Sequence, residues 1–199
     1  MTYYDHLINF GHHFQISPFV GIDTAYLKQD IKSNFAGTSN NQPYSITSFN
    51  DSKYIGFGPR LGINATYFFG HNFGIISEMA TSILVGSMES NTHFLSFGSG
   101  NTTPGYTGLA NDLTTTQIVP ELEGKLGLHY MRSFNSGSIM QLELGYLFST
   151  YLNGIKQVVP TALVPNAFNQ GVIAIETSSQ VQSNLDMNGP YLKLTYLFT

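Results

Sequence analysis

The sequence contains no cysteine and no tryptophan, and only 10% of its residues are charged, compared with about 25% in ordinary soluble domains. Because cysteine is absent, a disulfide framework and thiolate chemistry are excluded. The formal net charge of −4 provides no basic surface on which nucleic acid could bind. The composition therefore argues against a disulfide-stabilised domain and against a nucleic-acid-binding protein.

Long apolar runs are missing as well. A membrane-spanning helix needs roughly 18 unbroken apolar residues. The best stretch, residues 75–86, is interrupted by Ser77, Glu78 and Thr81. Helical membrane spans are therefore excluded.

Aromatic side chains, in contrast, are abundant. The 12 tyrosines and 15 phenylalanines make up 14% of the chain, although its mean hydropathy is only −0.02. A transmembrane β-barrel produces this combination, because one face of each strand meets lipid and the other meets water. Composition alone thus favours such a barrel, in a single domain that covers residues 1–199.

Apolar and polar residues alternate with a period of two, most clearly in residues 51–70. Successive residues of a strand point to opposite faces, whereas a helix would scatter both sets around its circumference. One face of this segment is apolar, and the other is small, polar or charged after Tyr54. The apolar face carries Ile55, Phe57, Pro59, Leu61, Ile63, Ala65, Tyr67 and Phe69, and the other face carries Gly56, Gly58, Arg60, Gly62, Asn64 and Thr66.

Six further segments show the same alternation, the first three of them clearly and the others over part of their length. They are residues 117–134, 138–152, 189–198, 4–16, 19–35 and 72–88. The sequence therefore predicts an all-β fold: an antiparallel, up-and-down transmembrane β-barrel with about seven visible strands.

The predicted connections fall into two classes. Tight turns are expected at residues 17–18, 70–71 and 135–137, and long polar loops at residues 36–50, 89–116 and 153–184. Short turns on one side and long loops on the other are typical of outer-membrane barrels. Aromatic residues cluster beside the short turns, as in an interfacial girdle; they are Phe14, Phe19, Tyr67, Phe69, Phe73, Tyr130, Phe134, Tyr196 and Phe198.

Charged side chains share the face that lies opposite the apolar one. Because a charge that faces lipid at the midplane costs about 2–4 kcal/mol for Arg or Lys, this shared parity predicts the barrel interior. Two interpretations remain open: a polar channel lining that sets ion preference, and internal ion pairs that plug a narrow barrel. Glycines on the same face leave room and favour the channel. The candidate pore-lining residues are Arg60, Asn64, Glu78, Glu121, Glu123, Lys125, Gln141, Glu143 and Lys193.

Hairpin geometry predicts two contacts on this face. Around the predicted turns, Lys125 becomes a diagonal neighbour of Glu143, and Arg60 becomes a diagonal neighbour of Glu78. A register error of one residue would place these partners on opposite faces.

Three prolines fall near the starts of predicted strands, where each strand leaves a long loop. Proline cannot donate to a β-ladder, so it belongs at a strand start, a bulge or an edge. We therefore expect Pro59, Pro120 and Pro190 near the rim on the long-loop side, each beside a locally broken ladder.

Catalytic and metal-binding signatures are missing. The sequence has no G-x-S-x-G, H-E-x-x-H or P-loop motif, and the nearest acid–base grouping, Glu121 and Glu123 with His129, spans several pleats of one strand face. His12 and His13 are adjacent, so they face opposite sides of a strand and cannot chelate a metal together. We therefore expect no enzymatic activity, no metal and no cofactor.

Three segments resemble a known family. The run YIGFGPRLGINATYFFGHNFGIISEMATSILVG at residues 54–86 resembles the Legionella-type major outer membrane protein family of pore-forming proteins, and residues 119–130 and 188–198 resemble its later strands. The resemblance covers most of the chain from about the second strand onward, and G-x-G-P-R-L-G is its most specific string. It implies a porin with a water-filled channel in the outer membrane of a Gram-negative-type cell.

Strand parity predicts that this barrel is incomplete. Bacterial single-chain barrels have an even number of strands, and an open sheet would leave unpaired edges in lipid. Members of the resembling family are longer and carry a signal peptide, whereas residues 1–5 have no basic and apolar leader signature. We therefore expect the chain to be the C-terminal part of a barrel, with an odd number of strands before Met1.

Three functions compete at this point. The leading one is a porin that allows passive diffusion of ions and small hydrophilic solutes. The alternative is an outer-membrane barrel that acts through its extracellular loops as an adhesin or structural anchor. A soluble lipocalin-like barrel is disfavoured, because its polar face would need more charge for solubility. The expected partners are outer-membrane lipids and the permeating solutes, with homo-oligomerisation left open.

Overall fold

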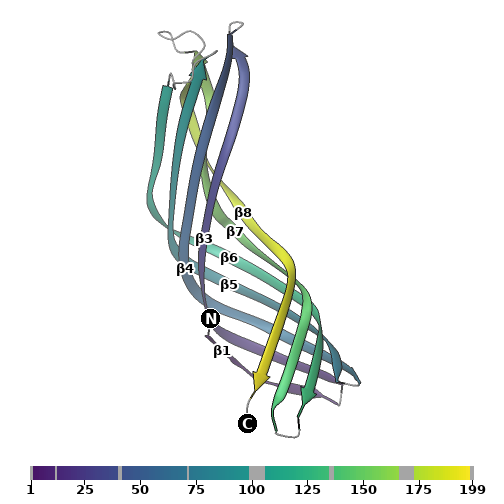
Figure 1. The fold of residues 1–199 in the computed structure, drawn as a ribbon. Helices are drawn as coiled ribbons and strands as arrows, with labels where there is room; N and C mark the ends of the chain where they lie inside the picture. Colours follow the sequence, from purple (N-terminus) through teal and green to yellow (C-terminus); the bar gives the residue numbers. More distant parts are fainter. Residues whose placement is uncertain are drawn as a thin grey trace.

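The computed structural model describes residues 2–11, 13–39, 42–70, 72–98, 106–134, 137–165 and 173–197. Figure 1 shows that these residues form one long, curled sheet. In the described residues we find no helix that could cross a membrane. The strands are β1 (Thr2–Asp5), β2 (Ile8–Phe10), β3 (Phe14–Ser39), β4 (Gln42–Gly70), β5 (Phe73–Gly98), β6 (Tyr106–Ser133), β7 (Ile139–Pro165) and β8 (Ile173–Leu197).

From β3 onward each strand lies beside its neighbours in sequence, and every pair in the sheet is antiparallel. The order is β1-β3-β4-β5-β6-β7-β8, and β2 pairs with the same edge of β3 as β1 does. The eight segments therefore occupy seven positions, which confirms the predicted all-β, up-and-down fold with about seven strands. Within the described residues β1 and β8 do not pair with each other, so the sheet is open, as expected for an incomplete barrel.

The turn predicted at residues 17–18 is wrong. Strand β3 runs straight through these residues, and the chain reverses near Gly11, whose φ of +71° suits glycine. Pro18 has no N–H group to donate, while its carbonyl oxygen accepts a hydrogen bond from the His6 amide at 3.1 Å. Pro18 thus interrupts the edge strand between β1 and β2 instead of turning the chain.

The three long polar loops are also largely strand. Strands β3 and β4 stay paired up to Ser39 and Gln42, and the other two hairpins extend in the same way. The stretches are rich in threonine and aromatic residues, which fit a pleated surface, and in serine, which is small enough for a buried face. On one face of β5 the alternate residues are all buried; they are Met88, Ser90, Thr92, Phe94 and Ser96.

Because the strands extend this far, the prolines do not begin them. Pro59 and Pro120 lie inside β4 and β6, and Pro190 lies inside β8 in regular register with β7. The ladder is interrupted beside two of them. Pairing of β4 with β5 skips the residues between Phe57 and Arg60, and pairing of β6 with β7 ends next to Pro120. The predicted strand starts are wrong, whereas the predicted breaks are found beside Pro59 and Pro120.

We divide the sheet into a proximal half, next to the short turns, and a distal half. The proximal half comprises residues 14–26, 55–69, 73–85, 118–130, 140–148 and 190–196, and the distal half comprises the remainder of β3 to β8. On the outer face of the proximal half, the leucine and isoleucine side chains predicted to face lipid are between 37% and 70% exposed. The apolar side of the alternation in each segment supplies these residues, so the outward orientation predicted for this side is confirmed; they are Ile55, Leu61, Ile63, Leu122, Leu126, Leu142, Leu144, Leu192 and Leu194.

The apolar outer band ends at nearly the same level on four adjacent strands. Its last residues are Tyr26, Ile55, Val85 and Ile118, and the next outer residues are Lys28, Lys53, Ser87 and Thr116. Tyr26 pairs with Ile55, and Lys28 pairs with Lys53. Val85 pairs with Ile118 in the same way. A shared level of this kind marks a change of solvent along the sheet.

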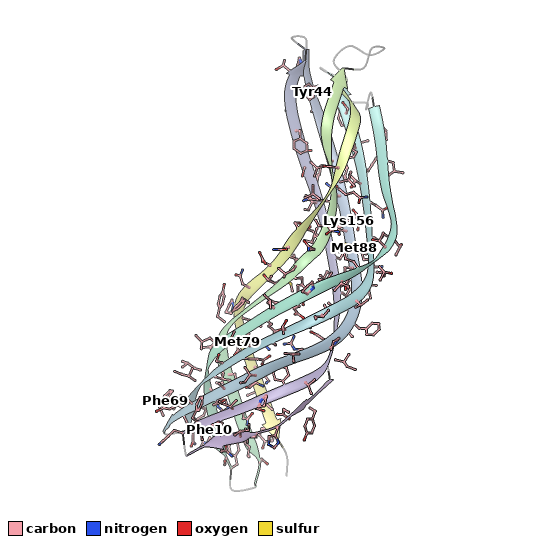
Figure 2. All side chains as sticks on the ribbon, turned by 180° about the vertical axis from the view of Figure 1, so that it is seen from behind. Phe10, Tyr44, Phe69, Met79, Met88 and Lys156 are labelled. Atoms are coloured by element: carbon pink, nitrogen blue, oxygen red, sulfur yellow. The ribbon has the colours of Figure 1, made fainter. Side chains whose placement is uncertain are left out.

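Above this level, β7 leaves β6 and crosses the inner face of the sheet, as both views of the ribbon show (Figures 1 and 2). The departure occurs near Asn153, which has a φ of +56°. The Lys156 amide then donates to Ser52 Oγ at 3.2 Å, and Ser90 Oγ donates to the Lys156 carbonyl at 3.1 Å. An apolar core fills the space; it includes Leu27, Ile46, Tyr54, Leu84, Met88, Phe94, Val119, Ile155 and Val158.

Candidate functional site

All nine candidate pore-lining residues lie on the inner face. Arg60 and Glu121 are each only 2% exposed, and Glu143 is buried as well. Lys193, on the edge strand β8, is the most exposed, at 62% of its side chain. Asn64 and Gln141 are partly buried. The nine residues therefore share one face, as the alternation predicts, but they do not all contact one another.

Arg60 lies at the centre of the largest group. Its Nη1 atom is 3.1 Å from Asp23 Oδ2 and 3.7 Å from Glu121 Oε2. Its Nη2 atom is 3.1 Å from Glu123 Oε2 and 3.4 Å from Glu78 Oε1. The register places Arg60 opposite small residues on both neighbouring strands, so its long side chain reaches carboxylates on β3, β5 and β6.

Lys125 extends this group along β6. Its Nζ atom lies 3.0 Å from Glu78 Oε1 and 2.7 Å from Glu123 Oε1. With Arg60, Asp23 and Glu121, the cluster has two cations and four carboxylates, a formal net charge of −2. We call these six residues the Arg60 cluster.

Hydroxyl groups support the most buried carboxylate. Ser82 Oγ donates to Glu121 Oε2, and Ser149 Oγ donates to Glu121 Oε1 at 3.2 Å. Ser149 belongs to β7, so this bond ties the cluster, whose residues lie on β3 to β6, to a fifth strand. Hydrogen bonds of this kind make a buried carboxylate tolerable, because they replace part of its hydration.

A second, smaller group lies beside β8. Glu143 is paired with Lys193, at 3.5 Å between Oε1 and Nζ, and it lies directly opposite His129 in the β6–β7 register. The His129 ring meets the Phe68 ring edge to face, with centroids 5.9 Å apart. His129 therefore groups with Glu143, not with Glu121 and Glu123.

The two predicted contacts have different outcomes. Arg60 does contact Glu78, although the two are not diagonal neighbours, because Glu78 lies directly opposite Asn64. The contact between Lys125 and Glu143 is wrong: Lys125 pairs with other carboxylates, and the residue opposite it is Leu147. All four side chains lie on the predicted inner face. The observed register of each hairpin therefore differs from the predicted one by two residues, which exchanges the neighbours of a side chain but keeps its face.

The inner-face glycines do not simply leave open space. A Cβ atom on Gly62 would lie 2.5 Å from Phe19 Cζ, and one on Gly127 would lie 2.8 Å from the Tyr191 hydroxyl. Phe19, expected in the outer girdle, is instead an inner residue and is only 6% exposed. Aromatic rings thus cover glycines on the inner face, as they do in other β-sheets, and they fill part of the predicted room.

The remaining girdle residues behave more nearly as predicted. Tyr67, Phe69, Phe73, Phe134 and Tyr196 are exposed on the outer face near the short turns, and Figure 2 shows Phe69 at that end. The rings of Phe73 and Tyr130 lie 4.7 Å apart. Phe198 lies outside the described residues.

Sequence reasoning missed Asp23, one of the four carboxylates around Arg60. Residues 19–35 alternate only over part of their length, so their inner face was not assigned. The signal is present, however, because Val20, Ile22 and Tyr26 define an outer face and leave Asp23 on the inner one. Ser82 and Ser149 carried no comparable signal, since serine is common on both faces.

In the part of the chain that the structure describes, no group of three or more histidine, aspartate or glutamate side chains is arranged so that it could hold a metal ion. His13 Nδ1 donates a hydrogen bond to the Phe68 carbonyl oxygen at 2.8 Å. His12 and His71 lie outside the described residues. What the inner face does carry is fixed charges of both signs, in the Arg60 cluster and in the pair of Glu143 with Lys193.

The comparison with protein families identifies the chain. Its sequence matches the family described as Legionella pneumophila major outer membrane protein precursor over residues 5–198. No curated protein matches it. The match spans nearly the whole sheet, including both the apolar outer band and the charged inner face. The chain therefore belongs to the Legionella major outer membrane protein family and is an integral β-barrel protein of the outer membrane.

Proposed function

We propose that the protein forms a water-filled pore that allows ions and small hydrophilic solutes to cross the outer membrane, without catalysing a reaction. The observation that carries the proposal is the Arg60 cluster, which lies within the proximal half on the face turned away from lipid. A charge needs water or partners inside a membrane, so such residues mark a polar pathway.

The composition of the cluster suggests an ion preference. Its formal net charge of −2 comes from four carboxylates and two cations. Rings of carboxylates favour cations at a constriction. We therefore propose that cations pass more readily than anions.

Conductance of the full-length protein in a planar bilayer tests the pore. We expect stepwise conductance, and a reversal potential across a KCl gradient that indicates cation preference. The Glu123→Gln variant removes one negative charge from the cluster and should shift this potential towards zero. Glu89→Gln, which changes a carboxylate on the distal outer face, is the matched control and should leave the potential unchanged.

The second candidate is an adhesin or structural anchor, in which the inner ion pairs plug the barrel. Two observations favour it: Arg60 and Glu121 are almost completely buried, and β7 covers the inner face of the distal half. A folded, membrane-inserted protein without conductance would support this candidate and would contradict the pore.

A further inference from the structure

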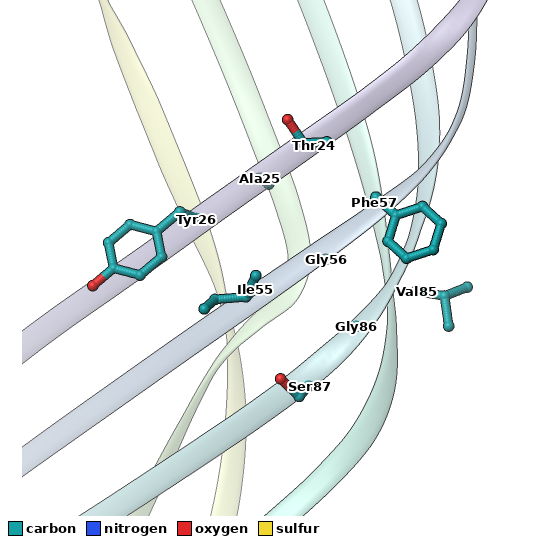
Figure 3. Close-up of a pocket in the computed structure, with 9 residues that line it drawn as sticks. All are labelled: Thr24, Ala25, Tyr26, Ile55, Gly56, Phe57, Val85, Gly86 and Ser87. Carbon is teal, nitrogen blue, oxygen red and sulfur yellow. The ribbon is translucent and has the colours of Figure 1, made fainter.

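The outer face carries a groove of about 540 Å³ at the upper edge of the apolar band (Figure 3). The register arranges its walls as two rows across β3, β4 and β5. Thr24, Phe57 and Val85 form one row, and Tyr26, Ile55 and Ser87 form the next. The small Thr24 and Ser87 side chains leave space between the larger ones, which creates the groove.

The walls of this groove are almost entirely apolar. Tyr26, Ile55, Phe57 and Val85 expose between 43% and 66% of their surface, on the face that meets the bilayer. A recess of this kind in a lipid-facing surface suits a hydrocarbon chain, because dispersion contacts are lost wherever the recess stays empty.

Charged residues follow directly above the groove. Lys28 and Lys53 lie opposite each other in the next outer row, and Asp30 and Asp51 lie opposite each other in the row after that. Two residues of a strand span roughly 6.6 Å. From the membrane outwards, the surface therefore presents an apolar groove, two ammonium groups and two carboxylates.

The contacts within the protein leave these groups accessible. Lys28 Nζ lies 3.2 Å from Asp30 Oδ2, and both side chains are exposed. Lys53 Nζ lies 5.8 Å from the centre of the Tyr26 ring, at the mouth of the groove. Among the described residues Lys53 makes no ion pair. Glu89 is its partner in register on β5, so the row of lysines also ends next to one carboxylate.

We propose that this surface is a binding site for a phospholipid whose headgroup carries a phosphate close to the membrane and an ammonium group further out. One acyl chain lies in the groove, Lys28 and Lys53 bind the phosphate, and Asp30 and Asp51 bind the ammonium group. A purely anionic headgroup fits less well, because its outer part would lie against the two aspartates. The site depends on the membrane-embedded fold and not on pore formation.

Native mass spectrometry of the detergent-solubilised, full-length protein tests the proposal. The probes are phosphatidylethanolamine and phosphatidylglycerol with identical acyl chains. We expect phosphatidylethanolamine to be retained more strongly. The double variant Lys28→Gln, Lys53→Gln should weaken its binding about tenfold, the loss expected when charge-assisted bonds to one phosphate are removed. Lys32→Gln, on the outer face two rows above the lysine pair, is the control and should bind normally.

Two further variants separate the parts of the site. Ser87→Leu fills the groove and should weaken binding of both lipids, whereas Ser77→Leu, on the outer face of the same strand below the groove, should not. Asp30→Asn with Asp51→Asn should abolish the preference for phosphatidylethanolamine. Equal retention of the two lipids by the unmodified protein, or unchanged binding by the lysine variant, would overturn the proposal whether or not the protein conducts ions.

Discussion

The proximal and distal halves of the sheet are made from the same strands but have opposite polarity. In the proximal half the outer face is apolar, as at Leu61 and Leu126, while the inner face carries the Arg60 cluster. In the distal half Met88 and Ile46 are buried inside, while Lys28 and Glu89 lie outside. The difference follows from the solvent, since lipid favours apolar outer residues and water favours polar ones.

The reversal needs no change of register. In β4 the outer residues keep the same parity from Phe69 to Thr47, and only their chemical type changes between Ile55 and Lys53. A single strand can therefore serve a membrane span and a water-exposed layer in succession. In β4 the boundary between the membrane-facing and the water-facing part of the outer face therefore lies between two consecutive outer residues, Ile55 and Lys53.

Removing the central cation of the proximal half should have the largest effect. Arg60→Leu leaves four carboxylates without their shared partner, and breaking a buried ion pair in this way costs about 3–5 kcal/mol. Urea unfolding of the protein in lipid vesicles, followed by circular dichroism, measures the loss. Arg132→Leu removes an exposed arginine near the short turns and serves as the control. Equal losses for both variants would contradict a buried network.

Two methionines compare the interior of the distal half with the outer face of the proximal half by the same substitution. Met88 is completely buried in the distal half, so Met88→Ala should destabilise this half by about 2–5 kcal/mol. Met79 lies on the outer face of the proximal half with 66% of its surface exposed, so Met79→Ala should have a small effect. Figure 2 shows both positions. Hydrogen exchange of the distal strands measures the difference, and a larger effect at Met79 would invert the assignment of faces.

An added charge tests where the solvent changes. Leu126→Arg places a cation on the outer face of the proximal half and should cost about 2–4 kcal/mol. Thr47→Arg makes the same kind of change on the outer face of the distal half and should stay within about 0.5 kcal/mol. The yield of folded protein in vesicles, judged by protection from protease, compares the two. Similar yields for the two variants would contradict a change of solvent between the proximal and the distal half.

The junction between the halves should give the smallest effect. Asn153 has a φ of +56°, which costs most residues about 1–2 kcal/mol. Asn153→Ala should therefore destabilise the protein by about 1 kcal/mol, since asparagine tolerates this conformation better than alanine. Asn153→Gly should cause no loss of stability from backbone strain, because glycine adopts a positive φ readily. The same urea titration measures both variants, and a larger loss with glycine would show that the side chain acts through its contacts.

The sequence predicts which face each residue occupies better than it predicts where a strand ends. Parity is written into every second residue, so Leu61 outside and Arg60 inside follow directly from the alternation. Strand ends depend on whether a partner strand continues. Residues 89–98 were therefore predicted as a loop although their serines and threonines are buried in a paired strand.

The partners within the candidate site were harder to predict than its members. A shift of two residues in a hairpin keeps every side chain on its face but exchanges its neighbours, which is why Lys125 contacts Glu78 and not Glu143. The covering of Gly62 by Phe19 depends on the pairing of β3 with β4. Such contacts follow from the three-dimensional register, which alternation alone does not fix.

The crossing of β7 over the inner face also has a consequence for folding. Consecutive hairpins can zip together one after another, because each closes a short loop. The bonds of Lys156 to Ser52 and Ser90 join residues 104 and 66 positions apart, so their loop-closure entropy is larger. The distal layer should therefore assemble last, after the proximal strands are already paired. During that interval its apolar core should be exposed to water, which should make the unfinished protein prone to aggregate until β7 docks.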